Sequence, residues 1–542
     1  MNNSITISNS PRDYGLPFDS WYNNQKDACE FALNLQPSQT LILEGPTGTG
    51  KSGIPALVSH FRPRTTALTH SRDLQSQYAT TLPVFSVIWG QDHYPCGDEE
   101  WSEEFRSRYG QKAIPTRADC PHKRVGDCPL VGECEYEIAK RVCMGARAKV
   151  LNYHYGFYSR WWRENTVDLF CDEAHRLPVV LSDLVSIELR ESLRTHYGLP
   201  DFPLARGGAP FMLQQAIRWV ERAMSTLLIL TRSRDIKVRK RAKWLREAMS
   251  TLREALESSE EAEWYIESTP GKEFLAKPVV PGVFASSILI PQARSVTLMS
   301  ATIGDPDVLA DELGIEGGFE FKSYPHIFPP SNRPVLWLKE SPRLSYRSDD
   351  RDYGRQIELI KGILSIHREE KGIIHTASWS HAKKLARGLS REGREIFLPD
   401  PKKRVESIEE FKYSPLGTVA ISPSWNEGLD LHDDLARFAI IAKVPWPSLA
   451  DPIVSLRLKR KGGRAWFDWV AALAVVQGAG RIVRHPEDFG VTYIVDGHWP
   501  RVARRAPKWF GWETVDRVSG CPGVRVSGCE SGDFVPGTGG GM

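Results

Sequence analysis

The sequence predicts an α/β protein with two domains, each built on a parallel sheet with flanking helices. Two series of short apolar segments, within residues 39–302 and 333–496, alternate with helical patterns, which is typical of buried parallel strands. A long stretch with helical periodicity, residues 211–258, interrupts the first series and predicts a helical insertion. With 542 residues the chain exceeds what one hydrophobic core usually holds, which agrees with several domains.

Bulk composition excludes few classes of protein. Hydrophobic residues make up 41% and charged residues 25%, as in ordinary globular proteins, and the net charge of +3 neither indicates nor excludes nucleic-acid binding. No run of about 18 uncharged apolar residues is present, so we expect no membrane span. The first residues lack a basic region followed by an apolar core, so we expect no secretory signal and a cytoplasmic protein.

The first apolar segment leads directly into a glycine-rich loop. Residues 39–52, QTLILEGPTGTGKS, contain the pattern G-x-x-x-x-G-K-[ST] after a candidate strand. Its glycines let backbone N–H groups approach phosphates, Lys51 supplies a positive charge, and the Ser52 hydroxyl can ligate Mg²⁺. The pattern therefore predicts a nucleoside triphosphate site rather than a glycine-rich turn without a nucleotide. The residues of this phosphate loop are Gly45, Pro46, Thr47, Gly48, Thr49, Gly50, Lys51 and Ser52.

A second candidate strand, residues 166–171, leads into Asp172-Glu173-Ala174-His175. A strand end would place Asp172 beside the phosphate loop, where it can hold Mg²⁺ through water, with Glu173 as the general base for the attacking water. We expect His175 to couple the nucleotide state to the neighbouring domain. An acidic helix cap is the alternative, but the preceding phosphate loop favours the catalytic interpretation.

The helical insertion is followed by a third candidate strand, residues 293–299, which ends in Ser300-Ala301-Thr302. The insertion itself carries a basic run, RSRDIKVRKRAKWLR, at residues 232–246. Such a run is either a solvated helix face or a nucleic-acid contact, and the sequence leaves both open.

The second series of strands begins near Arg333. Candidate strands cover residues 372–377, 417–422, 438–444 and 491–496. Residues 511–542 are rich in Gly and Ser and lack periodicity, so we expect a flexible tail.

A glutamine and two arginines form a compact pattern in the second series. Residues 477–484, QGAGRIVR, begin with Gln477 and place Arg481 and Arg484 three positions apart. This spacing predicts that both arginines face one way on a helix, and their planar guanidinium groups suit phosphate oxygens. Such a pair is common on solvated helix faces. After the phosphate loop and the acidic pair, it predicts the second half of a nucleotide site.

Four of the nine cysteines lie between the phosphate loop and Asp172. Without an export signal, such a cluster is more typical of metal binding than of disulfides. No C-x₂-C pair is present, which argues against the usual spacing of structural zinc and favours an iron–sulfur cluster held by irregular loops. Zinc and the absence of a metal remain the alternatives. The four cysteines are Cys96, Cys120, Cys128 and Cys134.

Together these motifs resemble those of the XPD/DinG family of iron–sulfur superfamily 2 DNA helicases. The resemblance covers most of residues 20–500 and includes the text around the cysteines, at residues 93–96, 134–140 and 150–155. It implies two RecA-like motor domains with parallel sheets and flanking helices. An iron–sulfur insertion would precede the DEAH residues, and a helical arch-like insertion would follow them.

The resemblance also implies domain boundaries. Motor domain 1 would comprise residues 1–95, 135–180 and 276–330, and motor domain 2 would comprise residues 331–510. The iron–sulfur insertion would be residues 96–134, the arch-like insertion 181–275, and the tail 511–542.

Further site residues follow from the resemblance. The segment NEGLD resembles a family motif that reads W-E-G-x-D, so Glu427, Gly428 and Asp430 would contact the nucleotide, although Trp425 is one residue out of register. Gln25 resembles the glutamine that recognises adenine, because its amide offers both a donor and an acceptor. A surface glutamine is the alternative.

The resemblance implies an ATP-dependent DNA helicase or translocase that uses ATP, Mg²⁺ and a [4Fe–4S] cluster and moves 5′→3′. Its substrates would be single-stranded DNA and forked or tailed duplex DNA, and it would act as a monomeric motor. The alternatives are a protein-displacing translocase without robust unwinding, an RNA helicase, and a regulator that binds DNA through a labile cluster. DNA repair, replication and recombination all remain open as its pathway.

Overall fold

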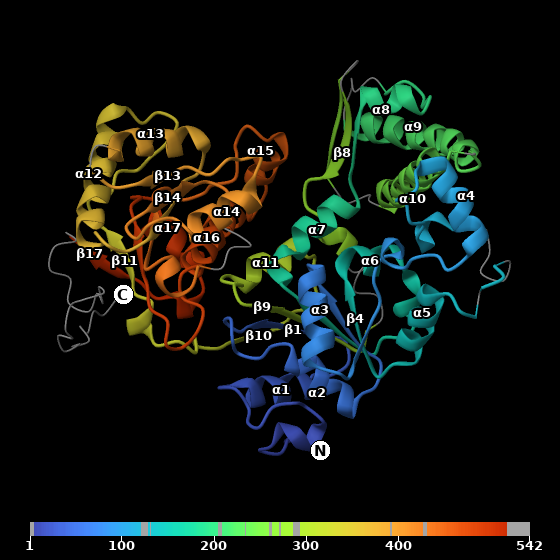
Figure 1. Cartoon of the computed structure of the whole chain (residues 1–542), viewed down its shortest axis with the longest axis horizontal. Helices are drawn as coiled ribbons and strands as arrows, with labels where there is room; N and C mark the ends of the chain where they lie inside the picture. Colours follow the sequence, from blue (N-terminus) through green and yellow to red (C-terminus); the bar gives the residue numbers. More distant parts are fainter. Residues whose placement is uncertain are drawn as a thin grey trace.

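The computed structural model describes residues 5–120, 128–130, 132–203, 209–233, 235–258, 263–269, 273–285, 293–390, 393–425 and 431–516. Within these residues the chain forms two seven-stranded parallel sheets and one three-stranded antiparallel sheet. Figure 1 shows the two large sheets as separate lobes, with the small sheet and two long helices projecting from the first lobe. The predicted α/β class with two parallel-sheet domains is confirmed.

The first sheet has the strand order β10-β1-β9-β5-β2-β4-β3. Its central strands are buried, which explains why the sequence shows apolar runs there rather than alternation. The strands are β1 (Gln39–Glu44), β2 (Thr65–Thr69), β3 (Phe85–Val87), β4 (Ala148–Asn152), β5 (Asp168–Asp172), β9 (Ser295–Ser300) and β10 (Glu320–Ser323). The accompanying helices are α1 (Gln25–Leu33), α2 (Gly53–Phe61), α3 (Arg72–Thr81), α6 (Tyr153–Tyr158), α7 (Leu177–Leu184) and α11 (Pro306–Glu312).

The second sheet has the strand order β13-β14-β12-β15-β16-β11-β17. Its strands are β11 (Val335–Leu338), β12 (Gly372–His375), β13 (Ile396–Phe397), β14 (Val419–Ser422), β15 (Phe438–Ile441), β16 (Val491–Ile494) and β17 (Glu513–Val515). Its helices are α12 (Asp350–Ile366), α13 (Trp379–Leu389), α14 (Arg404–Lys412), α15 (Pro452–Lys459), α16 (Gly463–Ala479) and α17 (Trp499–Val502). Asp349 and Ser378 accept backbone N–H groups at the starts of α12 and α13, which fixes where those helices begin.

The predicted tail is wrong at its start. Strand β17 lies within residues 511–542 and pairs in parallel with β11 at the edge of the second sheet. Trp512, just before it, packs edge-on against Trp337. A three-residue edge strand has no periodicity for a sequence pattern to detect, so its pairing depends on the partner strand. Residues 517–542 of the predicted tail lie outside the described residues.

Two insertions interrupt the first domain. The one after β3 contains α4 (Glu99–Tyr109) and α5 (Glu135–Gly145). The second contains β6 (Ile187–Arg190), α8 (Glu191–His196), α9 (Ala209–Leu230), α10 (Ile236–Ser258), β7 (Trp264–Thr269) and β8 (Glu273–Pro278). The helical prediction for residues 211–258 is confirmed, but the antiparallel sheet β6-β8-β7 was not predicted. Neither long helix, nor another helix of the described residues, carries an apolar stretch that could cross a membrane.

Candidate functional site

The phosphate loop joins β1 to α2, as the sequence predicts. Gly48 and Gly50 have φ values of +88° and +70°, a left-handed conformation that favours glycine. The Lys51 Nζ donates to the carbonyl oxygen of Gly45 at 2.6 Å, so the ammonium group lies over the loop. The loop geometry therefore suits the approach of phosphate oxygens to backbone N–H groups.

Gln25 forms a hydrogen bond with the backbone of this loop. Its side chain is buried, its Nε2 donates to the carbonyl oxygen of Gly50 at 2.7 Å, and its Oε1 accepts the N–H of Tyr22 at 3.2 Å. The alternative of a surface glutamine is therefore wrong. Recognition of adenine by Gln25 stays a prediction.

Asp172 and Glu173 lie at the end of β5, two strands from the phosphate loop. One oxygen of Asp172 accepts the hydroxyl of Tyr78 at 2.9 Å, and its carbonyl accepts the hydroxyl of Tyr153 at 2.7 Å. Burial and the neighbouring Glu173 raise the pKa of Asp172 to about 6, while Lys51 opposes the shift. A buried carboxylate with this environment suits a cation ligand, because a cation would stabilise its charged form.

His175 forms a hydrogen-bonded bridge between the two domains. Its Nε2 lies 2.7 Å from the amide nitrogen of Gln477 on α16, and its Nδ1 lies 2.7 Å from the hydroxyl of Ser300. Nδ1 also lies 3.3 Å from a carboxylate oxygen of Glu173. His175, Ser300 and Gln477 come from three predicted motifs, so this chain of contacts joins the two domains. Coupling of the nucleotide state through His175 stays a prediction.

One cavity of about 580 Å³ is lined by predicted site residues of both domains. Thr47, Glu173 and His175 line it from the first domain, and Gln477, Arg481 and Arg484 line it from the second. The cleft thus brings together one residue of the phosphate loop, two of the DEAH residues and both arginines, whereas Lys51, Ser52 and Asp172 do not line this cavity.

The prediction that Arg481 and Arg484 share a helix face is wrong. Helix α16 ends at Ala479, and both arginines lie on the irregular segment that follows. The chain must turn there to enter β16, and the N–H of Leu431 holds the turn by donating to the carbonyl oxygen of Arg481 at 3.2 Å. Both side chains nevertheless line the cleft.

Glu427, Gly428 and Asp430 lie outside the described residues. Trp425, which precedes them, is fully buried and packs between Phe397 and Phe411 in the core of the second domain. Its role is therefore in packing.

The four clustered cysteines converge on a second cavity. Cys96, Cys120, Cys128 and Cys134 all line a space of about 220 Å³, together with Arg117. Burial raises the pKa of the Cys96 and Cys128 thiols, and the neighbouring Cys120 adds to both shifts. All four thiols thus line one space, whereas Cys143 is buried elsewhere in the core. An iron–sulfur cluster in this space stays a prediction.

A third cavity, of about 900 Å³, lies between α10, α6 and the first insertion. Its α10 wall carries Lys237, Lys240, Arg241, Lys243 and Trp244. The Arg241 guanidinium lies 4.2 Å from the ring centroid of Trp244, so charge and an aromatic surface occur together. The basic run therefore lines a hollow, which favours a nucleic-acid contact over a solvated face.

Comparisons with known proteins agree with this geometry. The model of a helicase C-terminal domain matches residues 362–511, in the second domain. The ATP-dependent DNA helicase YoaA of Haemophilus influenzae is 23% identical over an alignment of 586 residues, which covers 85% of this chain and 88% of that protein. The chain is similar in sequence to helicases of the XPD/DinG family of superfamily 2.

Other relatives match part of their length. The regulator of telomere elongation helicase 1 homolog of Drosophila erecta is 26% identical over 277 residues, and the match spans 45% of this chain but 28% of that protein. Among solved structures, an XPD helicase has a TM-score of 0.54 at 14% identity, covering 91% of this chain and 98% of that one. Xpd4 of S. tokodaii has a TM-score of 0.51 at 13% identity, covering 89% and 96%. This similarity identifies the two sheets as RecA-like domains.

Two residues at the cleft of this protein were not predicted from sequence patterns. His326 and Arg333, from the connection between the two sheets, line the same cavity as the arginines. Burial, Arg333 and Lys51 lower the pKa of His326 to about 3, so its ring stays neutral beside Trp509. A lone histidine in a connection has no motif around it, so only the fold reveals its place.

Proposed function

We propose that this chain is an ATP-dependent DNA helicase that moves 5′→3′ on single-stranded DNA and couples ATP hydrolysis to strand separation. One observation carries the proposal: a single cavity is lined by Thr47 of the phosphate loop and by Glu173 and His175 of one domain, and by two arginines of the other. A site divided in this way is complete only when the two domains approach each other, which links chemistry to motion.

The division of roles follows from the side chains. Lys51 neutralises phosphate charge, and Ser52 with Asp172 would hold Mg²⁺, which supplies further charge at the phosphates. Glu173 orients and deprotonates the attacking water, and Arg481 and Arg484 stabilise the charge that develops on the transferred phosphoryl group.

The contact between His175 and Gln477 supports coupling between the domains. Because Gln477 lies on α16 and Ser300 ends β9, a shift of the second domain changes the hydrogen bonds of His175 next to Glu173. Nucleotide state and domain position are thereby linked through one imidazole ring.

The cysteine cavity supports a [4Fe–4S] cluster bound by Cys96, Cys120, Cys128 and Cys134. In this position the cluster would fix the irregular loops of the first insertion next to the first sheet. Zinc is distinguished from iron by metal analysis of protein purified without oxygen.

The basic cavity is proposed as part of the path of the DNA strand. Lys237, Arg241 and Lys243 of α10 would neutralise phosphates, because Lys240 is already paired with Asp119. Trp244 would stack on a base, which binds a single strand without reading its sequence.

ATP hydrolysis and strand displacement on tailed duplexes test the proposal. We expect single-stranded DNA to stimulate ATP turnover more than RNA does, with displacement of duplexes that carry a 5′ tail. Lys51→Ala should abolish both activities, whereas Lys26→Ala, a solvent-facing lysine of α1, should retain them. Stimulation without displacement would favour a translocase, and stimulation by RNA alone would contradict the DNA assignment.

A further inference from the structure

Arg484 lies on a segment that has no regular secondary structure. Residues 481–490 connect α16 to β16, and the helix that precedes them ends at Ala479. An arginine acts on a phosphoryl group only if its guanidinium is held in place, since position accounts for much of its effect. Because no helix fixes Arg484, other contacts must do so.

The carboxylate of Asp488 makes those contacts. It is fully buried, and its Oδ2 accepts the backbone N–H of Arg484 at 3.0 Å. Its Oδ1 accepts the Nη1 of Arg437 at 3.0 Å and the N–H of Asp433 at 3.2 Å. The N–H of Phe489 also donates to Oδ1, at 2.9 Å. One carboxylate therefore joins the segment that carries Arg484 to residues 431–437.

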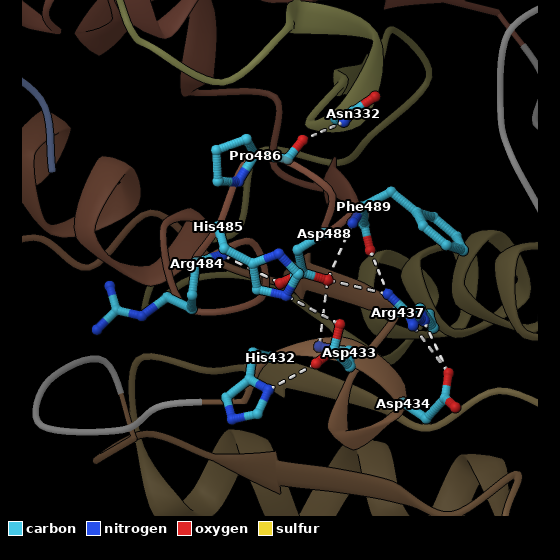
Figure 2. A network of polar contacts seen from close by, with 10 residues as sticks. All are labelled: Asn332, His432, Asp433, Asp434, Arg437, Arg484, His485, Pro486, Asp488 and Phe489. Atoms are coloured by element: carbon cyan, nitrogen blue, oxygen red, sulfur yellow. Dashed lines mark hydrogen bonds and ion pairs between the residues drawn. The ribbon is translucent and has the colours of Figure 1, made fainter. Parts of the chain in front are cut away.

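Figure 2 shows this arrangement, in which the Arg484 side chain extends away from the network while its backbone faces Asp488. A second contact binds the same two segments, because the Nε2 of His485 lies 3.1 Å from Asp433. Asn332, from the connection between the sheets, donates to the carbonyl oxygen of Pro486 at 2.9 Å. The segment is thus anchored at His485 and Pro486 as well as at Asp488, and the Asp488 contact reaches the backbone of Arg484 itself.

We propose that Asp488 is a positioning residue for Arg484. By accepting the Arg484 N–H, it holds the Arg484 backbone where the side chain reaches the cleft. The proposal rests on the proposed ATP hydrolysis. Arg437 neutralises the buried carboxylate of Asp488. Because Arg437 belongs to residues 431–437, this ion pair also holds that stretch beside Asp488.

An isosteric substitution separates positioning from folding. Asp488→Asn keeps one acceptor oxygen, which the three donors at Oδ1 retain, and the new amide NH₂ then faces the Arg484 N–H. Two donors cannot bond each other, so this variant loses the Arg484 contact in particular. The matched control is Asp434→Ala. Asp434 also pairs with Arg437, at 2.9 Å, but it is exposed and has no contact with Arg484 in the described structure.

Hydrogen exchange and steady-state kinetics test the variant in the full chain. We expect Asp488→Asn to lower kcat for ATP by roughly tenfold to a hundredfold with little change in the affinity for a non-hydrolysable ATP analogue. Peptides covering residues 481–490 should exchange faster in Asp488→Asn than in wild type. Asp434→Ala should match wild type in both measurements.

A double variant decides whether the effect passes through Arg484. In an Arg484→Ala background, Asp488→Asn should lower kcat by less than about twofold, because the group that it positions is gone. An equal loss in both backgrounds overturns the inference, as does unchanged exchange in residues 481–490. Wild-type protein without ATP turnover would overturn the proposed function as well, whereas turnover with additive losses overturns only the role of Asp488.

Discussion

Glu44, the last residue of β1, uses a buried carboxylate to hold the segment that reaches the second domain. Its Oε2 accepts the N–H groups of Ile303 at 2.8 Å and Gly304 at 2.6 Å, and its Oε1 accepts the Ser323 hydroxyl at 2.7 Å. Burial raises the pKa of Glu44, and these hydrogen bonds reduce the shift. The next residue begins the phosphate loop, so this one side chain connects the loop to a domain contact.

Glu44→Gln should be at least as stable as wild type at neutral pH. The amide keeps an acceptor for the two N–H groups and can donate to the Ser323 hydroxyl without burying a charge. Because the pKa of Glu44 is raised in the folded state, its protonated form stabilises the fold at pH values below the unfolded-state pKa. This contribution is lost as the pH rises through the folded-state pKa. The advantage of glutamine should therefore shrink as the pH falls toward roughly 4.

Urea unfolding of both proteins across this pH range measures the difference. Glu44→Ala is the control, because it leaves two buried N–H groups without acceptors and should cost about 2 kcal/mol or more. A glutamine advantage that grows on acidification would contradict the assigned direction of the pKa shift.

At the scale of elements, the first insertion surrounds a cavity and has only a small apolar core among its described residues. Its small apolar cluster centres on Trp101 and Phe105 of α4. Its four thiols occupy the space between α5 and the irregular loops. Cross-linking by a metal is a common way to stabilise so small a unit.

Cys120→Ser should lower the iron content and the visible absorbance of anaerobically purified protein, and impair strand displacement more than ATP hydrolysis. The reason is that one of the four proposed ligands would be lost while the cleft is untouched. Cys143→Ser is the matched control, since Cys143 is buried outside the cavity and should leave the iron content unchanged. Equal iron in both variants would remove Cys120 from the ligand set.

Helix α10 presents its basic residues to the large cavity, whereas α9 packs beside it. Lys243→Glu should weaken binding of single-stranded DNA and reduce the dependence of log Kd on log salt by about one. Arg222→Glu, on the exposed side of α9, makes the same charge change outside the cavity and should leave the slope unchanged. Fluorescence titrations at several salt concentrations compare the two, and equal slopes would argue against this path.

At the scale of the whole molecule, a few contacts connect the two RecA-like domains behind the cleft. The indole of Trp469 on α16 donates to the carbonyl oxygen of Ile303 at 2.7 Å, and Arg505 forms an ion pair with Asp305. The segment that Glu44 holds is therefore the one that the second domain contacts.

Asp305→Asn, which keeps the Oδ1 acceptor that caps α11, and Arg505→Ala should each reduce the stimulation of ATP turnover by single-stranded DNA, by roughly twofold to tenfold. The double variant should be no worse than either single variant, because both remove the same partly buried ion pair. A mutant cycle of stimulated ATPase rates measures this coupling. Additive losses would show that the two residues act separately.

The sequence predicts those parts of the molecule that depend on neighbours along the chain. The phosphate loop and the central strands are found because glycine spacing and continuous apolar runs are local signals. The end of α16, by contrast, depends on where β16 lies, so the helical placement of Arg481 and Arg484 was wrong. Asp488 and His326 were not predicted because the residues that they contact are distant in the sequence. The pairing of β17 with β11 is a long-range contact of the same kind.

The ion pair of Lys240 with Asp119, at 2.6 Å, joins the two insertions across one side of the basic cavity. The wall of that cavity is thereby held together on one side by residues far apart in sequence. Breaking this bridge should let the two insertions move independently, so a strand bound in the cavity should dissociate faster.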